Sequence, residues 1–160
     1  MPGIDPRIVE HEIKTYPNAK TIRQKLCLVN LKKALEIMAK IEKLLKVEFI
    51  YLVPLTEWVS NPVSVTKKEW SIRVCTDFCD LNLVFPKDNY PTPFIDQIID
   101  DCGGNKIFSF MDGFSGYSQI QIKPGDQHNT TLICTWGTFS YRKISFGLKN
   151  VGATFQRAMS

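Results

Sequence analysis

The stretch from Phe108 to Ile120 reads FSFMDGFSGYSQI, and it decides how the rest of the chain is interpreted. Residues Ile107 to Asp112 are apolar apart from one serine and the closing acid, which predicts a buried strand that ends in an aspartate. Gly113 and Gly116 then interrupt the pattern. Asp112 is therefore expected at a strand end, where a carboxylate can meet solvent, a metal ion or a phosphate. The alternative is that it accepts backbone hydrogen bonds in a turn.

The segment after this aspartate, Gly113 to Tyr117, combines two glycines with an aromatic residue. Glycine lets a ligand approach main-chain amides closely, and Tyr117 could pack against a sugar. Ordinary turn and core packing would use the same residue types, so this short motif has two interpretations. It is not the Asp-Thr/Ser-Gly signature of aspartic proteases, because the residues after Asp112 differ and no second copy exists.

A β-hairpin is predicted upstream of this stretch. Residues 63–66 and 72–76 both alternate between apolar and polar side chains, and the polar segment Lys67–Ser71 separates them. Arg73 would lie on the second strand, with Lys67 and Lys68 at the tip. A guanidinium fork and two ammonium charges suit a triphosphate, although a solvated hairpin surface would look the same.

Helical periodicity is clearest between Leu31 and Val47, where Asn30 occupies the N-cap position. One face of this helix carries the apolar residues Leu31, Leu35, Met38, Ile41 and Leu45. No regular structure is expected between the hairpin and Phe94, because Pro86, Pro91 and Pro93 lie there. Further elements are expected as a short helix from Phe94 to Gly103, a strand around Ile120 and Ile122, strands at 131–135 and 138–144, and a helix at 149–159.

Strands and helices thus mix without a strict βαβ repeat, which favours the α+β class. Residues 1–26 carry three prolines and no sustained periodicity, so we expect an extended lead-in. Residues 27–160 would form the folded part.

The composition is that of a globular chain: 160 residues, 44% hydrophobic and 22% charged, with a net charge of +4. Residues 1–70 hold 12 Lys and Arg against 8 acids, whereas residues 71–160 hold 8 against 8. This modest basic bias permits contact with a phosphate backbone without requiring it. The five cysteines include no Cys-x-x-Cys pair, which favours reduced thiols. With no signal-peptide pattern and no apolar run of 18 residues, we expect an intracellular chain that does not enter a membrane.

Together these segments resemble the reverse transcriptase of gypsy-type retrotransposons, in plant-like form. Residues 67–78 with Leu81-Asn82 resemble the fingers hairpin, and residues 86–91 with Ile95-Asp96 continue it. FSFMDGFSGYSQI is similar to the first catalytic motif of the palm. FGLKNVGATFQRAM, from Phe146 to Met159, is similar to the motif that follows it.

The resemblance implies an incomplete right-hand polymerase, with fingers at 27–92 and 124–146 and palm at 93–123 and 147–160. Asp112 would be the catalytic carboxylate that binds Mg²⁺ or Mn²⁺, with the Gly113 carbonyl as a second metal contact. Tyr117 would exclude the ribose 2′-hydroxyl. The residues implied to bind the nucleotide are Lys67, Lys68, Arg73, Ser115, Gly116, Tyr117, Phe146 and Gly147.

The family also carries a Tyr-x-Asp-Asp motif, and these 160 residues contain none. One of three carboxylates cannot hold two metal ions against their hydration, so we expect a truncated domain that is inactive alone and binds metal weakly. The complete enzyme would use a template-primer of RNA or DNA, deoxynucleoside triphosphates and the rest of the Pol polyprotein. Two alternatives are a non-enzymatic nucleic-acid-binding or interaction module and a fragment that does not fold.

Overall fold

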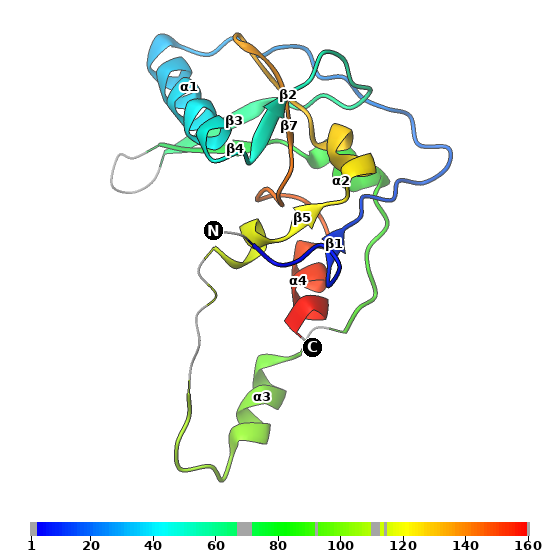
Figure 1. Cartoon of the computed structure of the whole chain (residues 1–160), viewed down its shortest axis with the longest axis vertical. Coiled ribbons are helices and arrows are strands. Elements are labelled where there is room, and N and C mark those ends of the chain that lie inside the picture. The colour runs from blue at the N-terminus through cyan, green and yellow to red at the C-terminus, as the bar shows by residue number, and fades with distance from the viewer. Residues whose placement is uncertain (1–2, 67–71, 92, 110–112, 114, 160) are drawn as a thin grey trace.

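The computed structural model describes residues 3–66, 72–91, 93–109, 113 and 115–159. It shows a mixed α and β body with one helix set apart at the end of the long axis (Figure 1). The strands are β1 (Glu10–His11), β2 (Ile50–Leu52), β3 (Pro62–Thr66), β4 (Ile72–Thr76), β5 (Gln121–Ile122), β6 (Leu132–Cys134) and β7 (Gly137–Tyr141). The α-helices are α1 (Leu31–Lys46), α2 (Cys79–Val84), α3 (Ile95–Cys102) and α4 (Val151–Met159), and 3₁₀ helices cover Gly116–Gln119 and Pro124–Thr130.

Among the described residues, the strands form three small sheets. β2, β7 and β6 lie side by side in that order and are antiparallel, and β3 pairs with β4 as an antiparallel hairpin. β1 pairs in parallel with β5, with His11 opposite Ile122. These pairings confirm the predicted hairpin and the predicted α+β class.

The predicted helix at 31–47 is confirmed, including its cap, because the Asn30 side chain accepts a hydrogen bond from the Lys33 backbone N–H (N···O 2.9 Å). The apolar face read from the sequence is buried only in part. Ile37 and Ile41 are buried, whereas Leu31, Leu35 and Leu45 are exposed. This helix has apolar residues on more than one side, and its packing against β2, β3 and β4 selects the stripe that is buried.

The predicted strand at 107–112 is not present in its described part. Residues 107–109 have no regular structure, and Ile107 is 87% exposed. An apolar run becomes a strand only where a partner supplies the ladder hydrogen bonds, and no described strand lies beside these three residues. Residues 110–112, including Asp112, lie outside the described residues.

Helix α2 contradicts the prediction that no regular structure lies between the hairpin and Phe94. The prolines that prompted this prediction all follow the helix, and its six residues are too few to show a helical period. Asp77 gives a local signal, since its Oδ1 accepts a hydrogen bond from the Cys79 N–H (3.0 Å) at the start of the helix. From Phe85 to Phe94 the chain has no helix or strand in its described part, as expected.

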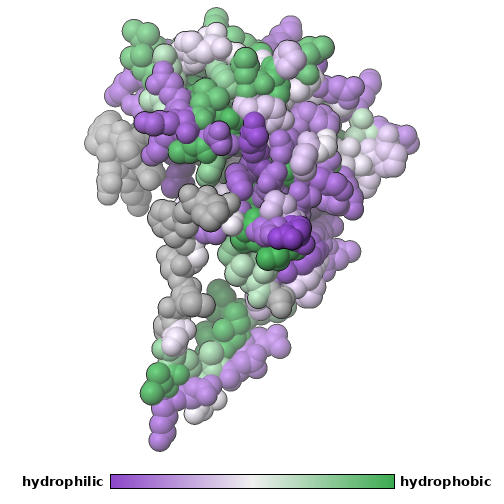
Figure 2. All heavy atoms as spheres, viewed as in Figure 1, coloured by the Kyte–Doolittle hydropathy of each residue, from purple (hydrophilic) through white to green (hydrophobic). Residues whose placement is uncertain are grey.

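Helix α3 forms where predicted but buries none of its apolar side chains. Phe94, Ile95, Ile98 and Ile99 are exposed, and Figure 2 shows apolar atoms on the surface of this lower part of the molecule. The helix α4 and the strands β6 and β7 also confirm the predicted elements, with shorter bounds.

The core joins segments that are far apart in the sequence. Its largest fully buried side chains are Phe78, Ile50, Leu81, Ile120 and Ile122. The N-terminal segment, expected as a lead-in, contains β1 and contributes to this core through Val9 and Ile13. No helix among the described residues is long and apolar enough to cross a membrane, and the five cysteines are free thiols.

Candidate nucleotide-binding site

A pocket of about 310 Å³ lies between the turn at 113–118, the segment after β7 and the start of α4. We call it the Tyr117 pocket. Its lining consists of residues 115–118, 144–148, 151 and 152. Five of the residues that the sequence implicated in nucleotide binding line it together: Ser115, Gly116, Tyr117, Phe146 and Gly147. Two motifs separated by about thirty residues in the chain thus share one cavity.

The turn at one side of this pocket has an unusual backbone. Ser115 adopts a left-handed conformation (φ 52°, ψ 33°), which is uncommon for a residue with a side chain. The Gly113 carbonyl accepts a hydrogen bond from the Gly116 N–H (N···O 3.0 Å). This carbonyl was implied to be a metal contact, and one of its two acceptor directions is already used inside the turn.

The aromatic wall of the pocket is Tyr117, whose side chain is 49% exposed. Its ring meets the ring of Phe155 on α4 edge to face, with ring centroids 5.2 Å apart. Phe155 also lies close beneath Gly116, because a Cβ built on that glycine would be 2.9 Å from Phe155 Cε2. Only glycine fits there without displacing the ring.

The opposite wall is held in place by Asn82 of α2. Its Nδ2 donates to the Gly147 carbonyl (2.7 Å), and its Oδ1 accepts from the Lys149 backbone N–H (2.9 Å). The Lys149 ammonium donates to the backbone carbonyls of Asn82 (3.1 Å) and Phe85 (2.6 Å). Gly147 has a φ of +101°, a conformation that residues with side chains rarely adopt. No role was predicted for Asn82 or Lys149 from the sequence.

Replacing Asn82 with Ala is expected to lower the free energy of unfolding by about 1–3 kcal/mol, because a donor and an acceptor lose their partners. Urea denaturation followed by circular dichroism measures this change. Asn105→Ala is the matched control, since its side chain makes one exposed hydrogen bond at the end of α3. If both variants unfold at the wild-type urea concentration, the hydrogen bonds of Asn82 do not stabilise this wall of the pocket.

A second hollow of about 180 Å³ adjoins the Tyr117 pocket and shares four lining residues with it: Ser118, Ile144, Ser145 and Phe146. Lys40 of α1 and Val74 of β4 line its other side. Lys40 is a cation near the predicted site that no sequence motif indicated, because only the folded chain brings α1 there. Tyr141 lies at the same hollow, where burial raises the pKa of its hydroxyl group.

The remaining predicted residues are not brought into the pocket. Arg73 is exposed on β4, opposite Val65, and lines neither hollow. Lys67, Lys68 and Asp112 lie outside the described residues. Within the described part of the chain, no group of three His, Cys, Asp or Glu residues could hold a metal ion. The described residues therefore do not complete a metal site.

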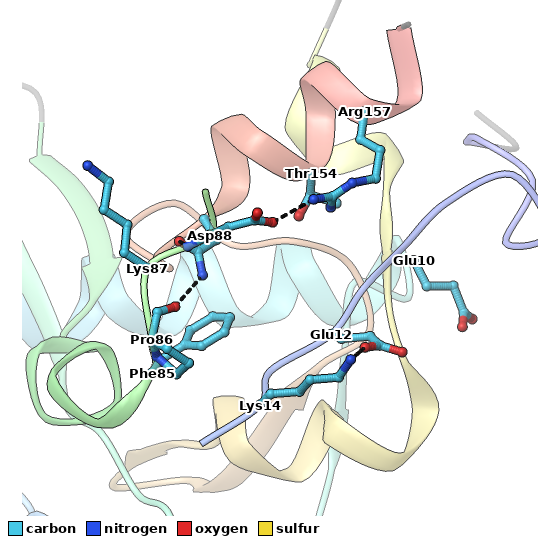
Figure 3. A pocket seen from close by; sticks show the side chains of 10 residues that line it. Glu10, Glu12, Lys14, Phe85, Pro86, Lys87, Asp88, Thr154 and Arg157 are labelled. Atoms are coloured by element: carbon cyan, nitrogen blue, oxygen red, sulfur yellow. Dashed lines mark hydrogen bonds and ion pairs between the residues drawn. The ribbon is translucent and has the colours of Figure 1, made fainter. Parts of the chain in front are cut away.

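A third hollow, of about 370 Å³, is enclosed by three parts of the chain (Figure 3). They are the region of β1, the residues that follow α2, and helix α4. Its charged groups largely pair with one another. Arg157 binds Asp88 (2.8 Å), and Lys14 binds Glu12. Arg157 lowers the pKa of Asp88. None of the predicted site residues lines this hollow, and we interpret it as a polar junction between the N-terminal segment and α4.

Beside this junction, the buried side chain of His11 forms a hydrogen bond with the hydroxyl group of Thr154 (Nδ1···Oγ1 2.9 Å). Its Nε2 atom has no hydrogen-bond partner among the described residues. Burial lowers the pKa of this imidazole from 6.5 to about 4, and the nearby Asp88 carboxylate opposes the shift only in part. His11 is therefore neutral at pH 7.

The chain resembles known proteins in sequence. It is 38% identical over 92 residues to an RNA-directed DNA polymerase homolog of Oenothera berteroana, covering 58% of this chain and 65% of that protein. It is also 34% identical over 133 residues to a retrovirus-related Pol polyprotein from transposon 412 of Drosophila melanogaster, covering 78% of this chain and 10% of the polyprotein. The chain is a homologue of retrotransposon reverse transcriptases.

The fold also resembles that of solved reverse transcriptase structures. The structure of this chain matches a crystal structure of Prototype Foamy Virus Protease-Reverse Transcriptase with a TM-score of 0.78 and 20% sequence identity. The match covers 94% of this chain and 20% of the viral chain. A foamy viral protease-reverse transcriptase in complex with an RNA/DNA hybrid matches with a TM-score of 0.73 and 18% identity, over the same shares of the two chains. The fold is thus a partial polymerase-like fold. No protein-family model matches the chain.

Proposed function

We propose that this chain carries the nucleotide-binding part of an RNA-directed DNA polymerase, and that the Tyr117 pocket receives the sugar and base of an incoming deoxynucleoside triphosphate. The observation that carries the proposal is the meeting of the two motifs in one pocket. A volume of about 310 Å³ is at the lower end of the range for small-molecule sites. Tyr117 and Phe146 supply exposed aromatic surface, and the glycines give access to the backbone.

The partners in this proposal are an RNA or DNA template-primer and a deoxynucleoside triphosphate. One of the similar foamy viral structures is in complex with an RNA/DNA hybrid, which supports a nucleic-acid partner of this kind. Arg73 stays the proposed contact for the triphosphate, together with Lys67 or Lys68. Lys40 is a further cation at the hollow that adjoins the pocket.

Asp112 stays the proposed metal-binding carboxylate, with Mg²⁺ or Mn²⁺ as the ion. No group of three His, Cys, Asp or Glu among the described residues could hold such an ion, so we assign no step of the reaction to a metal. Polymerisation needs further carboxylates, and these 160 residues contain no Tyr-x-Asp-Asp sequence. We therefore propose that the 160-residue chain binds nucleotide and does not extend a primer by itself.

Titration of the ¹⁵N-labelled chain with dATP tests the proposal. We expect chemical-shift changes at residues 115–118 and 144–148. Replacing Tyr117 with Ala removes one wall of the pocket and is expected to weaken binding by about 1 kcal/mol, or roughly fivefold. Tyr16→Ala is the matched control, because Tyr16 is exposed to a similar extent (55%) and does not line the pocket.

A primer-extension arm on an RNA template with Mg²⁺ separates binding from catalysis. No extension is expected from the chain. Extension that disappears in Asp112→Asn would show that these residues suffice for catalysis and would contradict the proposed inactivity. The absence of any dATP-dependent shift would contradict the nucleotide site itself. Salt-sensitive binding of a primer-template duplex without nucleotide binding would favour a nucleic-acid-binding module instead.

A further inference from the structure

Phe155 of α4 is a residue to which neither the sequence motifs nor the proposed site assigned a role. It does not line the Tyr117 pocket, but it supports the wall of that pocket from behind. The ring is partly buried against the core and meets the Tyr117 ring edge to face, with centroids 5.2 Å apart and an interplanar angle of 80°. This is the favoured geometry for an aromatic pair.

The same ring also limits the backbone of the turn. A Cβ at Gly116 would be 2.9 Å from Phe155 Cε2, and a Cβ at Gly113 would be 3.7 Å from Phe155 Cζ. The turn between them contains Ser115 in its left-handed conformation. Phe155 therefore leaves no room for a side chain at Gly116, would meet one at Gly113, and packs against the ring of Tyr117.

Helix α4 links these contacts to the opposite wall. Its first residues, Val151 and Gly152, line the Tyr117 pocket directly. One helix therefore forms part of one wall and, through Phe155, supports the other. Among the described residues, the ring contact that restrains Tyr117 is its contact with Phe155.

We propose that Phe155 is a positioning residue for Tyr117, and that its ring determines how well the pocket distinguishes deoxyribonucleotides from ribonucleotides. This inference rests on the proposed function. A 2′-hydroxyl is excluded only if the aromatic ring beside it cannot move aside, because a close contact with a mobile ring is relieved at little cost. Phe155 supplies the restraint. Its loss would leave Tyr117 present but free to turn away.

The test compares dATP with ATP, which differ only at the 2′ position, as ligands of the full chain. The wild-type chain is expected to bind dATP more tightly than ATP. In Phe155→Ala the ratio of the two dissociation constants is expected to fall by about two- to tenfold, the range that one aromatic pair contributes. Tyr117→Ala is expected to lower the ratio equally, and the double variant to lower it no further, because both changes act through the Tyr117 ring.

A second readout needs no nucleotide. The ring resonances of Tyr117, observed in a chain with ¹³C-labelled tyrosine, are expected to shift and sharpen in Phe155→Ala as the ring gains freedom. Phe155→Tyr keeps an aromatic ring in place and is expected to preserve both the resonances and the ratio. Ile41→Val, in the buried face of α1, is the control for a general loss of stability and is expected to leave the ratio unchanged.

The outcomes separate the inference from the proposed function. Absence of binding by both nucleotides to the wild-type chain would overturn the proposed site and, with it, this inference. A wild-type preference for dATP that persists in folded Phe155→Ala would overturn the inference and leave the site intact. Unchanged Tyr117 resonances in Phe155→Ala would also overturn it, whatever the nucleotides do.

Discussion

Replacing Phe78 with Ala is expected to lower the free energy of unfolding by about 3–5 kcal/mol, the cost of emptying a buried phenylalanine site. Phe78 is 2% exposed and meets Tyr141 edge to face, with ring centroids 6.2 Å apart. It also lies beneath Gly147, since a Cβ on that glycine would be 3.7 Å from Phe78 Cδ2. The side chain thus joins β7 to the wall of the Tyr117 pocket.

This loss is a large fraction of the total free energy of unfolding, which is only about 5–15 kcal/mol for a domain of this size. Urea denaturation monitored by circular dichroism measures it, and Phe78→Leu, expected to cost about 1 kcal/mol, provides a folded variant if the Ala variant unfolds. The matched control is Phe94→Ala. Phe94 is 76% exposed, and its removal is expected to change stability by about 0.5 kcal/mol or less. Equal losses for Phe78→Ala and Phe94→Ala would contradict the described core.

A fall in pH from about 7 to about 5 is expected to destabilise the chain by about 2 kcal/mol through His11 alone. Burial lowers the pKa of His11 from 6.5 to about 4 in the folded chain, whereas the unfolded chain keeps the ordinary value. Between these two values the unfolded state binds the extra proton. The stability from the neutral imidazole is therefore complete above pH 6.5 and is lost as the pH falls toward 4.

Between pH 7 and pH 5, the effect of His11 on stability can be separated from the effect of protonating the carboxylates. The pKa of Glu12 is lowered to about 2 by hydrogen bonds from Lys123 and Lys14, and a lowered carboxylate pKa affects stability mainly below about pH 5. His11→Gln is expected to abolish the slope between pH 7 and 5. His128→Gln, at an exposed position, is the control and is expected to keep it. A slope that survives in His11→Gln would show that another group is responsible.

Much of the local structure could be predicted because short-range patterns carry it. The Asn30 cap and the 3.6-residue period fix α1, and alternation fixes β3 and β4. The two motifs that line the Tyr117 pocket were also recognisable from their sequences. The physical reason is that caps, turns and periodicity depend on residues within a few positions of one another.

The failures have a common cause in contacts between distant segments. Leu31 and Leu35 fit the helical period as well as Ile37 does, and only the packing of α1 on the strands decided which of them is buried. The apolar residues Ile107 and Phe108 are exposed because no described strand pairs with them. An apolar pattern indicates which residues can be buried. The segment that packs against them determines which residues are in fact buried.

By itself the sequence determined the types of side chain, the α+β class and the two motifs that lead to the reverse transcriptase family. Only the tertiary structure decided that those motifs share one pocket, that Asn82 and Phe155 support its opposite walls, and that His11 lies buried against Thr154. The contacts of Asn82, Phe155 and His11 join residues that are 38 to 143 positions apart. Such contacts form only when chain closure and burial act together, and no local pattern records them.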